Sequence, residues 1–276
     1  IHQFMSSTKL ARSSSNLWAP TWITIDGPSS KDLDDAICVT TDGHGGTLLR
    51  VAIADPTGRV PLGSDPDRFA MTLGATVYAR EHPIQRMLPP DLTEDAASLV
   101  AGQPRPAVVI EVHVANDLSV GKVAISATQI EVSRRLSYAD IPAILADVDD
   151  PVHGMVSAAA TLSKLLLQRR RDGGALAYFD LSRFLLTDED GRLRAYERAD
   201  EMVGHIIVQE HMILANTLVA GYLVEHDIPG LFRNSSNSGK PSMMHWMHAP
   251  KIARTASRRR WPPRPSARSI RATRYG

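Results

Sequence analysis

The alternation of apolar and polar residues predicts a β-rich first half of the chain. Short apolar runs rich in β-branched and aromatic residues predict strands at 22–25, 36–40 and 47–54. Two longer runs, 107–114 and 121–133, flank Asn116-Asp117, a pair typical of turns. We therefore expect these two longer runs to form an antiparallel pair of strands.

Helical spacing of apolar residues dominates the second half. It predicts helices at 65–80, 138–146, 152–171 and 200–226. Asp65 is a candidate N-cap with Pro66 in the first turn, and the last segment is the longest, with one broad apolar face. A hairpin is expected where 183–186 and 192–196 flank Asp-Glu-Asp-Gly. Strands and helices do not alternate as βαβ units, so we predict an α+β fold with a mixed, mainly antiparallel sheet and packed helices.

Composition narrows the class of protein. The 276 residues are 43% hydrophobic, which is enough for a sizeable core. No run of 18 apolar residues occurs, and the first ten residues lack the pattern of a secretory signal, so neither a membrane span nor secretion is expected. The single cysteine, Cys38, excludes an internal disulfide and a multi-cysteine zinc site. These features favour a cytoplasmic protein.

Charge divides the chain into two parts. No Asp or Glu follows Asp227, so the first 227 residues carry all 30 acidic residues and a net charge of −10. A domain with this balance is not a generic nucleic-acid binder. We divide the chain into a lead-in (1–20), a catalytic-type domain (21–234) and a basic Pro/Arg-rich tail (235–276). We interpret the tail as a disordered arm or a segment read in a shifted frame, and favour the second.

Four carboxylates fall within ten residues, in the loop between the first two predicted strands. They are Asp26, Asp32, Asp34 and Asp35. Four like charges this close repel one another unless cations neutralise them or the loop is open to water. Oxygen ligands without His or Cys suit Mg²⁺ or Mn²⁺, and two such ions can activate water against a phosphodiester. The loop is thus either a divalent-cation site or a solvated acidic turn.

Two other acidic motifs are excluded. A calcium-binding EF loop counted from Asp32 needs glycine at its sixth position and glutamate at its twelfth. Those positions are Ile37 and Gly43. The sequence Asp32-Leu-Asp-Asp35 also fits the acid motif of some terpene cyclases, which are all-helical and rich in aromatic residues. Here the motif lies between predicted strands in a chain with 5% aromatic residues.

The segment from Thr24 to Ala36 closely resembles the signature of the ribonuclease II (RNB) family of 3′→5′ exoribonucleases. Other stretches resemble family segments in the same order: VAIADPT (51–57), TVY (76–78), MLPPDL (87–92), SL (98–99), GALAY (174–178) and VQEHMILAN (208–216). The likeness runs from about Trp22 to Arg233. It implies Mg²⁺-dependent hydrolysis of single-stranded RNA from the 3′ end, with release of nucleoside 5′-monophosphates.

The resemblance also implies roles for individual residues. Asp26 and Asp35 correspond to principal metal ligands, and Asp32 to a ligand that binds directly or through water. Asp34 corresponds to a residue at the metal ions and the terminal nucleotide, and we expect it to be the most critical for chemistry. Tyr78 and Tyr178 correspond to aromatic rings that sandwich the terminal bases, since stacking tolerates any base. Taken without the family, each tyrosine reads as a half-buried core ring.

The chain also departs from the family pattern. Where the family has Glu-Glu, this chain has Gln209-Glu210, so Gln209 keeps hydrogen-bonding capacity toward RNA without the charge. The flanking RNA-binding domains of the family do not fit in this chain, and its Thr-Ser-Pro-Ile-Arg segment, which supplies an arginine to the scissile phosphate, is echoed only faintly near Ser269. The alternative is therefore a truncated or degenerate member that binds RNA or metal without turnover.

Overall fold

The computed structural model describes residues 20–79, 82–174, 185–187, 193–195 and 202–230. Its centre is a closed barrel of five strands in the order β1-β2-β3-β6-β7. The strands are β1 (Trp22–Asp26), β2 (Asp35–Thr41), β3 (Thr47–Ala54), β6 (Pro104–Val114) and β7 (Ala124–Ser137). Neighbours pair antiparallel except β1 and β7, whose parallel pairing closes the barrel.

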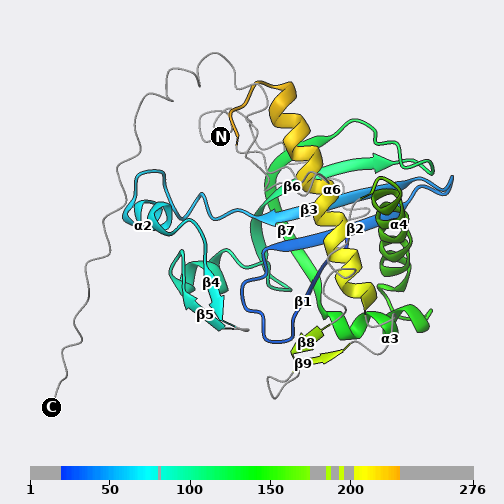
Figure 1. Cartoon of the computed structure of the whole chain (residues 1–276), viewed down its shortest axis with the longest axis horizontal. Coiled ribbons are helices and arrows are strands. Elements are labelled where there is room, and N and C mark those ends of the chain that lie inside the picture. The colour runs from blue at the N-terminus through cyan, green and yellow to red at the C-terminus, as the bar shows by residue number, and fades with distance from the viewer. Residues whose placement is uncertain (1–19, 80–81, 175–184, 188–192, 196–201, 231–276) are drawn as a thin grey trace. The chain divides into compact units, whose positions relative to one another are not determined.

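Three helices cover one face of these strands. They are α3 (Ile141–Ala146), α4 (His153–Asp172) and α6 (Val203–Glu225), and a 3₁₀ turn, η2 (Tyr138–Asp140), leads from β7 into α3. Figure 1 shows α6 in yellow and α4 in dark green lying over the strands. Val156 of α4 and Ile207 of α6 share one apolar cluster with barrel residues such as Ile37. The predicted α+β class, with a mainly antiparallel sheet and packed helices, is confirmed.

Both faces of β2 are buried in its central part, and its side chains alternate between two clusters because a β-strand has a two-residue period. Along β2, Ile37 and Val39 belong to the cluster that includes the helices. The intervening Ala36 and Cys38 belong to a second cluster, together with Trp22. Continuous apolar strands thus pack on both sides, as their sequence indicates.

The segment between β3 and β6 is built from short elements. These are α2 (Asp65–Leu73), the β4–β5 hairpin (Val77–Ala79 and His82–Gln85) and a π-helical turn, η1 (Asp91–Ala96). The predicted helix at 65–80 is wrong beyond Leu73, because Gly74 adopts a left-handed conformation with φ +71° and ends α2. The N-cap is Ser64 rather than Asp65, and its Oγ accepts from the backbone N–H of Asp67.

The other predicted elements agree with the structure within a few residues where the structure describes them. The predicted hairpin corresponds to the antiparallel pair β8 (Leu185–Thr187) and β9 (Leu193–Ala195). The tail and the predicted boundary after residue 234 lie outside the described residues.

Helix α6 is unusually apolar. Its most apolar 18-residue window has a mean hydropathy of 1.3, so by length and composition it is one helix that could cross a membrane. The core helix of a soluble protein passes the same test, and α6 contributes the buried residues Ile207, Leu214 and Ala215 to the barrel-facing cluster. Glu210 and His211 also interrupt its apolar sequence. The helix is therefore weak support for a membrane span.

The chain divides into two compact units, 1–219 and 220–276. Within the second unit the described residues include the end of α6, where the ring of Tyr222 stacks on that of His226 with centroids 4.0 Å apart.

Candidate functional site

The acidic loop joins two neighbouring strands at one end of the barrel. Asp26 is the last residue of β1 and Asp35 the first of β2. The two strands run antiparallel, with Ile23 paired to Ile37. The backbone N–H of Ala54 donates to the carbonyl of Asp34, so the β2–β3 ladder continues into the loop. Barrel geometry therefore fixes both ends of the loop.

The second half of the loop is anchored from the segment before β6. Leu33 is buried, and its backbone N–H donates to Ser98 Oγ at 3.0 Å. Ser98 Oγ donates in turn to the carbonyl of Lys31 at 2.9 Å, and Leu99 N–H donates to the carbonyl of Leu33 at 2.9 Å. Ser98 and Leu99 are fully buried. These bonds place Asp32 and Asp34 on either side of a buried leucine.

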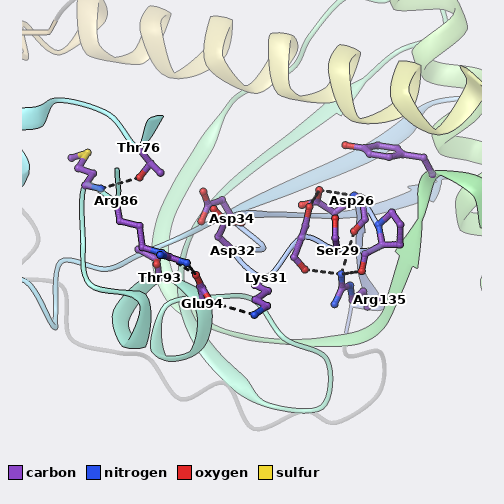
Figure 2. A pocket seen from close by; sticks show the side chains of 15 residues that line it. Asp26, Ser29, Lys31, Asp32, Asp34, Thr76, Arg86, Thr93, Glu94 and Arg135 are labelled. Atoms are coloured by element: carbon purple, nitrogen blue, oxygen red, sulfur yellow. Dashed lines mark hydrogen bonds and ion pairs between the residues drawn. The ribbon is translucent and has the colours of Figure 1, made fainter. Parts of the chain in front are cut away.

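The first half is held from β7. Arg135 Nη2 donates to the carbonyl oxygens of Gly27, Pro28 and Ser30, at 3.2, 3.1 and 2.7 Å. On the same turn, Asp26 Oδ1 accepts from the backbone N–H of Gly27 and from Ser30 Oγ, both at 2.7 Å. Figure 2 shows Arg135 against this stretch, with Asp26 on the same turn.

The loop forms one wall of a pocket of about 1110 Å³. Asp26, Asp32 and Asp34 line it, whereas Asp35 does not. The facing wall comes from residues 76–94. Glu94 of this wall forms ion pairs with Arg86 of the same wall and with Lys31 of the acidic loop. Figure 2 shows Asp32 and Asp34 between Arg86 and the turn that carries Asp26. The remaining lining residues are Gly27, Pro28, Ser29, Ser30, Thr76, Met87, Thr93, Arg135 and Tyr138.

Two carboxylates of the loop, Asp34 and Asp35, have a raised pKa. Burial, followed by the charges of Asp26 and Asp34, raises the pKa of Asp35 to about 6. Burial, followed by the charges of Asp32 and Asp26, raises the pKa of Asp34. Within the described residues neither Asp34 nor Asp35 forms an ion pair with Lys, Arg or His. The site therefore concentrates negative charge that no described basic side chain neutralises at these two residues.

The donor set fits a hard divalent cation by its chemistry, because it consists of carboxylate oxygens whose mutual repulsion a cation would relieve. The side chains do not converge on one point, however: no group of three or more His, Cys, Asp or Glu in the described part of the chain is arranged to hold a metal ion. Mg²⁺ usually takes one or two carboxylates and completes its shell with water and substrate phosphate. A pair of these aspartates meets that requirement.

None of the three residues predicted to bind RNA is among those that line the pocket in the described structure. Tyr78 lies in β4, paired with Pro83, and Tyr178 lies outside the described residues. Gln209 is on α6, and its Nε2 donates to Glu210 Oε1 at 2.8 Å. It is not among the residues that line the pocket. These three roles therefore stay predictions.

Sequence reasoning missed several pocket residues. Arg135 is one half of an Arg-Arg pair in a strand, with no local signal that separates it from Arg134. Arg86 and Glu94 belong to a segment whose turns were not predicted. Tyr138 also lines the pocket, and its ring stacks on that of His205 with centroids 3.7 Å apart. Only its aromatic character at the junction of a predicted strand and helix would have marked it.

A second polar cluster lies between α4 and α6. Arg170 Nη1 donates to Glu210 Oε1, and the side chain of Glu210 is fully buried. Beside it, the Nδ1 of His211 bonds to the carbonyl of Ile207 at 2.6 Å, which requires the hydrogen on Nδ1 because a carbonyl only accepts. Burial lowers the pKa of His211 to about 4. Glu210 Oε2 and His211 Nε2 are buried without hydrogen-bond partners.

A family model described as the RNB domain matches residues 14–261. Exoribonuclease 2 of Yersinia enterocolitica is 34% identical over 213 residues, which cover 74% of this chain and 33% of the relative. The chain thus spans about a third of the length of this curated relative.

Solved structures of an RNase R are also similar to this chain. RNase R of Mycoplasma genitalium in complex with double-stranded RNA matches with a TM-score of 0.65 and 26% identity, over 82% of this chain and 42% of that chain. The same protein in complex with ribose-methylated single-stranded RNA matches with a TM-score of 0.64 and 25% identity, over 82% and 36%.

Proposed function

The chain belongs to the RNB domain family, and on that premise we propose that it hydrolyses single-stranded RNA from the 3′ end and releases nucleoside 5′-monophosphates. The observation that carries the proposal is the pocket lined by Asp26, Asp32 and Asp34, in which burial and then the charges of Asp32 and Asp26 raise the pKa of Asp34. Its curated relative is an exoribonuclease, and the neighbouring RNase R structures hold RNA.

The proposed cofactor is Mg²⁺, with Mn²⁺ as a substitute. Asp26, Asp32, Asp34 and Asp35 are the proposed ligands, and Asp34 is the residue proposed to be most critical for chemistry. Bound divalent ions supply an activated water and neutralise charge on the scissile phosphate. The protein's own part is to hold the aspartates at a fixed spacing, which the bonds from Ser98, Leu99 and Arg135 to the loop support.

RNA is proposed to enter the same pocket. A volume of about 1110 Å³ exceeds that of pockets for drug-sized ligands and leaves room for a nucleotide. Tyr78 and Tyr178 are proposed to stack on the bases, and Gln209 to hydrogen-bond a nucleotide through its amide. Arg86 and Lys31 on the pocket wall offer positive charge to the RNA backbone.

A second candidate function is RNA or metal binding without turnover. Two observations favour it: the described acidic side chains do not converge as a group of three, and the amide of Gln209 is hydrogen-bonded to Glu210. The two candidates differ in whether RNA shortens.

The test is incubation of the purified chain with 5′-labelled oligoadenylate and Mg²⁺. The exonuclease produces a ladder that shortens from the 3′ end, and Asp34→Asn abolishes it. The matched control is Asp117→Asn, which changes an exposed aspartate in the β6–β7 turn and leaves the ladder unchanged. RNA retained without shortening by the wild-type chain supports binding alone and contradicts the exonuclease.

A further inference from the structure

We infer that Arg135 is a positioning residue that holds the acidic loop in shape for cation binding without neutralising it. This inference rests on the proposed function, since it concerns the cation site of that pocket. It assigns a task to a side chain on β7 more than 100 residues away from the loop in sequence.

The contacts of Arg135 are concentrated on one turn. One nitrogen, Nη2, reaches three carbonyl oxygens within four consecutive residues, those of Gly27, Pro28 and Ser30. Because Nη2 carries two hydrogens, at least one hydrogen is shared between two carbonyls. The parallel pairing of β1 and β7 sets Arg135 beside Thr24, and so places its guanidinium next to the chain that leaves β1.

The same turn carries Asp26. The backbone N–H of Ser30 donates to the carbonyl of Gly27 at 3.2 Å, which closes the turn. Ser30 Oγ then donates to Asp26 Oδ1 at 2.7 Å. Arg135 therefore holds the turn by its carbonyls, while the hydroxyl of the turn orients the carboxylate. Loss of Arg135 removes one hydrogen bond from each of three carbonyls and loosens the orientation of Asp26.

The choice of acceptor matters for charge. The hydrogen bonds of Arg135 in the described structure go to neutral carbonyls, and Arg135 forms no ion pair with an aspartate of the described loop. An arginine paired directly with Asp26 or Asp34 would compete with a cation for the same oxygens. Arg134 shows the contrast, since its Nη1 donates to both carboxylate oxygens of Asp150, at 2.9 and 2.8 Å.

These neighbouring arginines supply a matched test, with Mn²⁺ binding measured by electron paramagnetic resonance. Arg135→Gln is expected to raise the Kd for Mn²⁺ on the order of 10-fold, the usual effect of removing a residue that orients metal ligands. Arg135→Lys restores part of the affinity. Arg134→Gln loses the ion pair with Asp150 but leaves the Kd unchanged. RNA binding measured in EDTA is the same in wild type and Arg135→Gln.

Three results would overturn the inference. The first is wild-type Mn²⁺ affinity in Arg135→Gln. The second is equal weakening in Arg134→Gln and Arg135→Gln, which would mark a general loss of stability. The third is weaker RNA binding in EDTA for Arg135→Gln, which would make Arg135 an RNA contact. If the wild-type chain itself does not bind Mn²⁺, the proposed cation site is contradicted, and the inference about Arg135 fails with it. This result differs from the three above, in each of which the wild-type chain binds Mn²⁺.

Discussion

Two groups of carboxylates in this molecule are treated in opposite ways. In the pocket, Asp34 and Asp35 are crowded by other aspartates, and burial together with that crowding raises their pKa. Between α4 and α6, the fully buried Glu210 is met by the guanidinium of Arg170. The fold thus supplies a basic partner to one carboxylate and leaves the others to repel one another.

The difference separates a structural ion pair from a candidate cation site. Even partial burial of a carboxylate costs free energy unless a partner compensates it, and Asp34 and Asp35 have no basic partner among the described residues. The Arg170–Glu210 pair ties two helices together. The acidic loop is instead held by hydrogen bonds to its backbone, from Ser98 on one side and from the guanidinium of Arg135 on the other.

The largest effect on stability is expected from breaking the Arg170–Glu210 ion pair. Arg170→Met removes the partner of a buried charge, and the free energy of unfolding is expected to fall by about 3 kcal/mol. Urea denaturation measures it. Arg169→Met is the control, because Arg169 only donates to the carbonyl of Leu118 at an exposed site. An equal loss of stability in both variants would show that the Arg170–Glu210 ion pair contributes no more than an exposed arginine does.

A smaller effect is expected at the loop anchor. Ser98→Ala removes the partner of the buried N–H of Leu33 and of the partly buried carbonyl of Lys31. Stability is expected to fall by about 2 kcal/mol, because unsatisfied buried polar groups carry their desolvation cost. Thermal unfolding measures the loss, with Ser126→Ala on the exposed part of β7 as the control. An unchanged melting temperature would mean that Ser98 does not anchor the loop.

The pH dependence in EDTA sharpens the comparison at the acidic loop. The pKa of Asp35 is raised from 3.8 to about 6 in the fold. Between these values the folded chain binds more protons, so this contribution to stability is full below about pH 4 and lost as the pH rises through about 6. Its slope is at most about 1.4 kcal/mol per pH unit. Asp35→Asn removes this slope; an unchanged slope would place the carboxylate in an unperturbed environment.

His211 acts in the opposite direction over nearly the same range. Its pKa is lowered from 6.5 to about 4, so the unfolded chain binds more protons between these values. This contribution is present above pH 6.5 and lost as the pH falls toward 4. In the wild-type chain the two slopes oppose each other, and the net effect is the smallest expected here. His211→Leu leaves stability that falls more steeply with rising pH; a slope identical to that of wild type contradicts the assignment.

The features that could be predicted from the sequence are those that depend on residues close together in the chain. The strands around the acidic loop follow from apolar runs, and the clustering of Asp32, Asp34 and Asp35 is visible in the chain itself. Helix α2 was predicted too long because the left-handed conformation of Gly74 depends on its setting. The parallel pairing of β1 with β7 joins residues about 110 positions apart and has no local signal. The same is true of Arg135, whose importance depends entirely on that pairing.

The most direct test of the central claim, that the acidic loop holds a divalent cation, is an anomalous difference map from crystals soaked in Mn²⁺. The account predicts a peak in the pocket within ligand distance of Asp34 and at least one of Asp26, Asp32 or Asp35, and no peak there in Asp34→Asn. Ordered wild-type crystals with an empty pocket at saturating Mn²⁺ would contradict it.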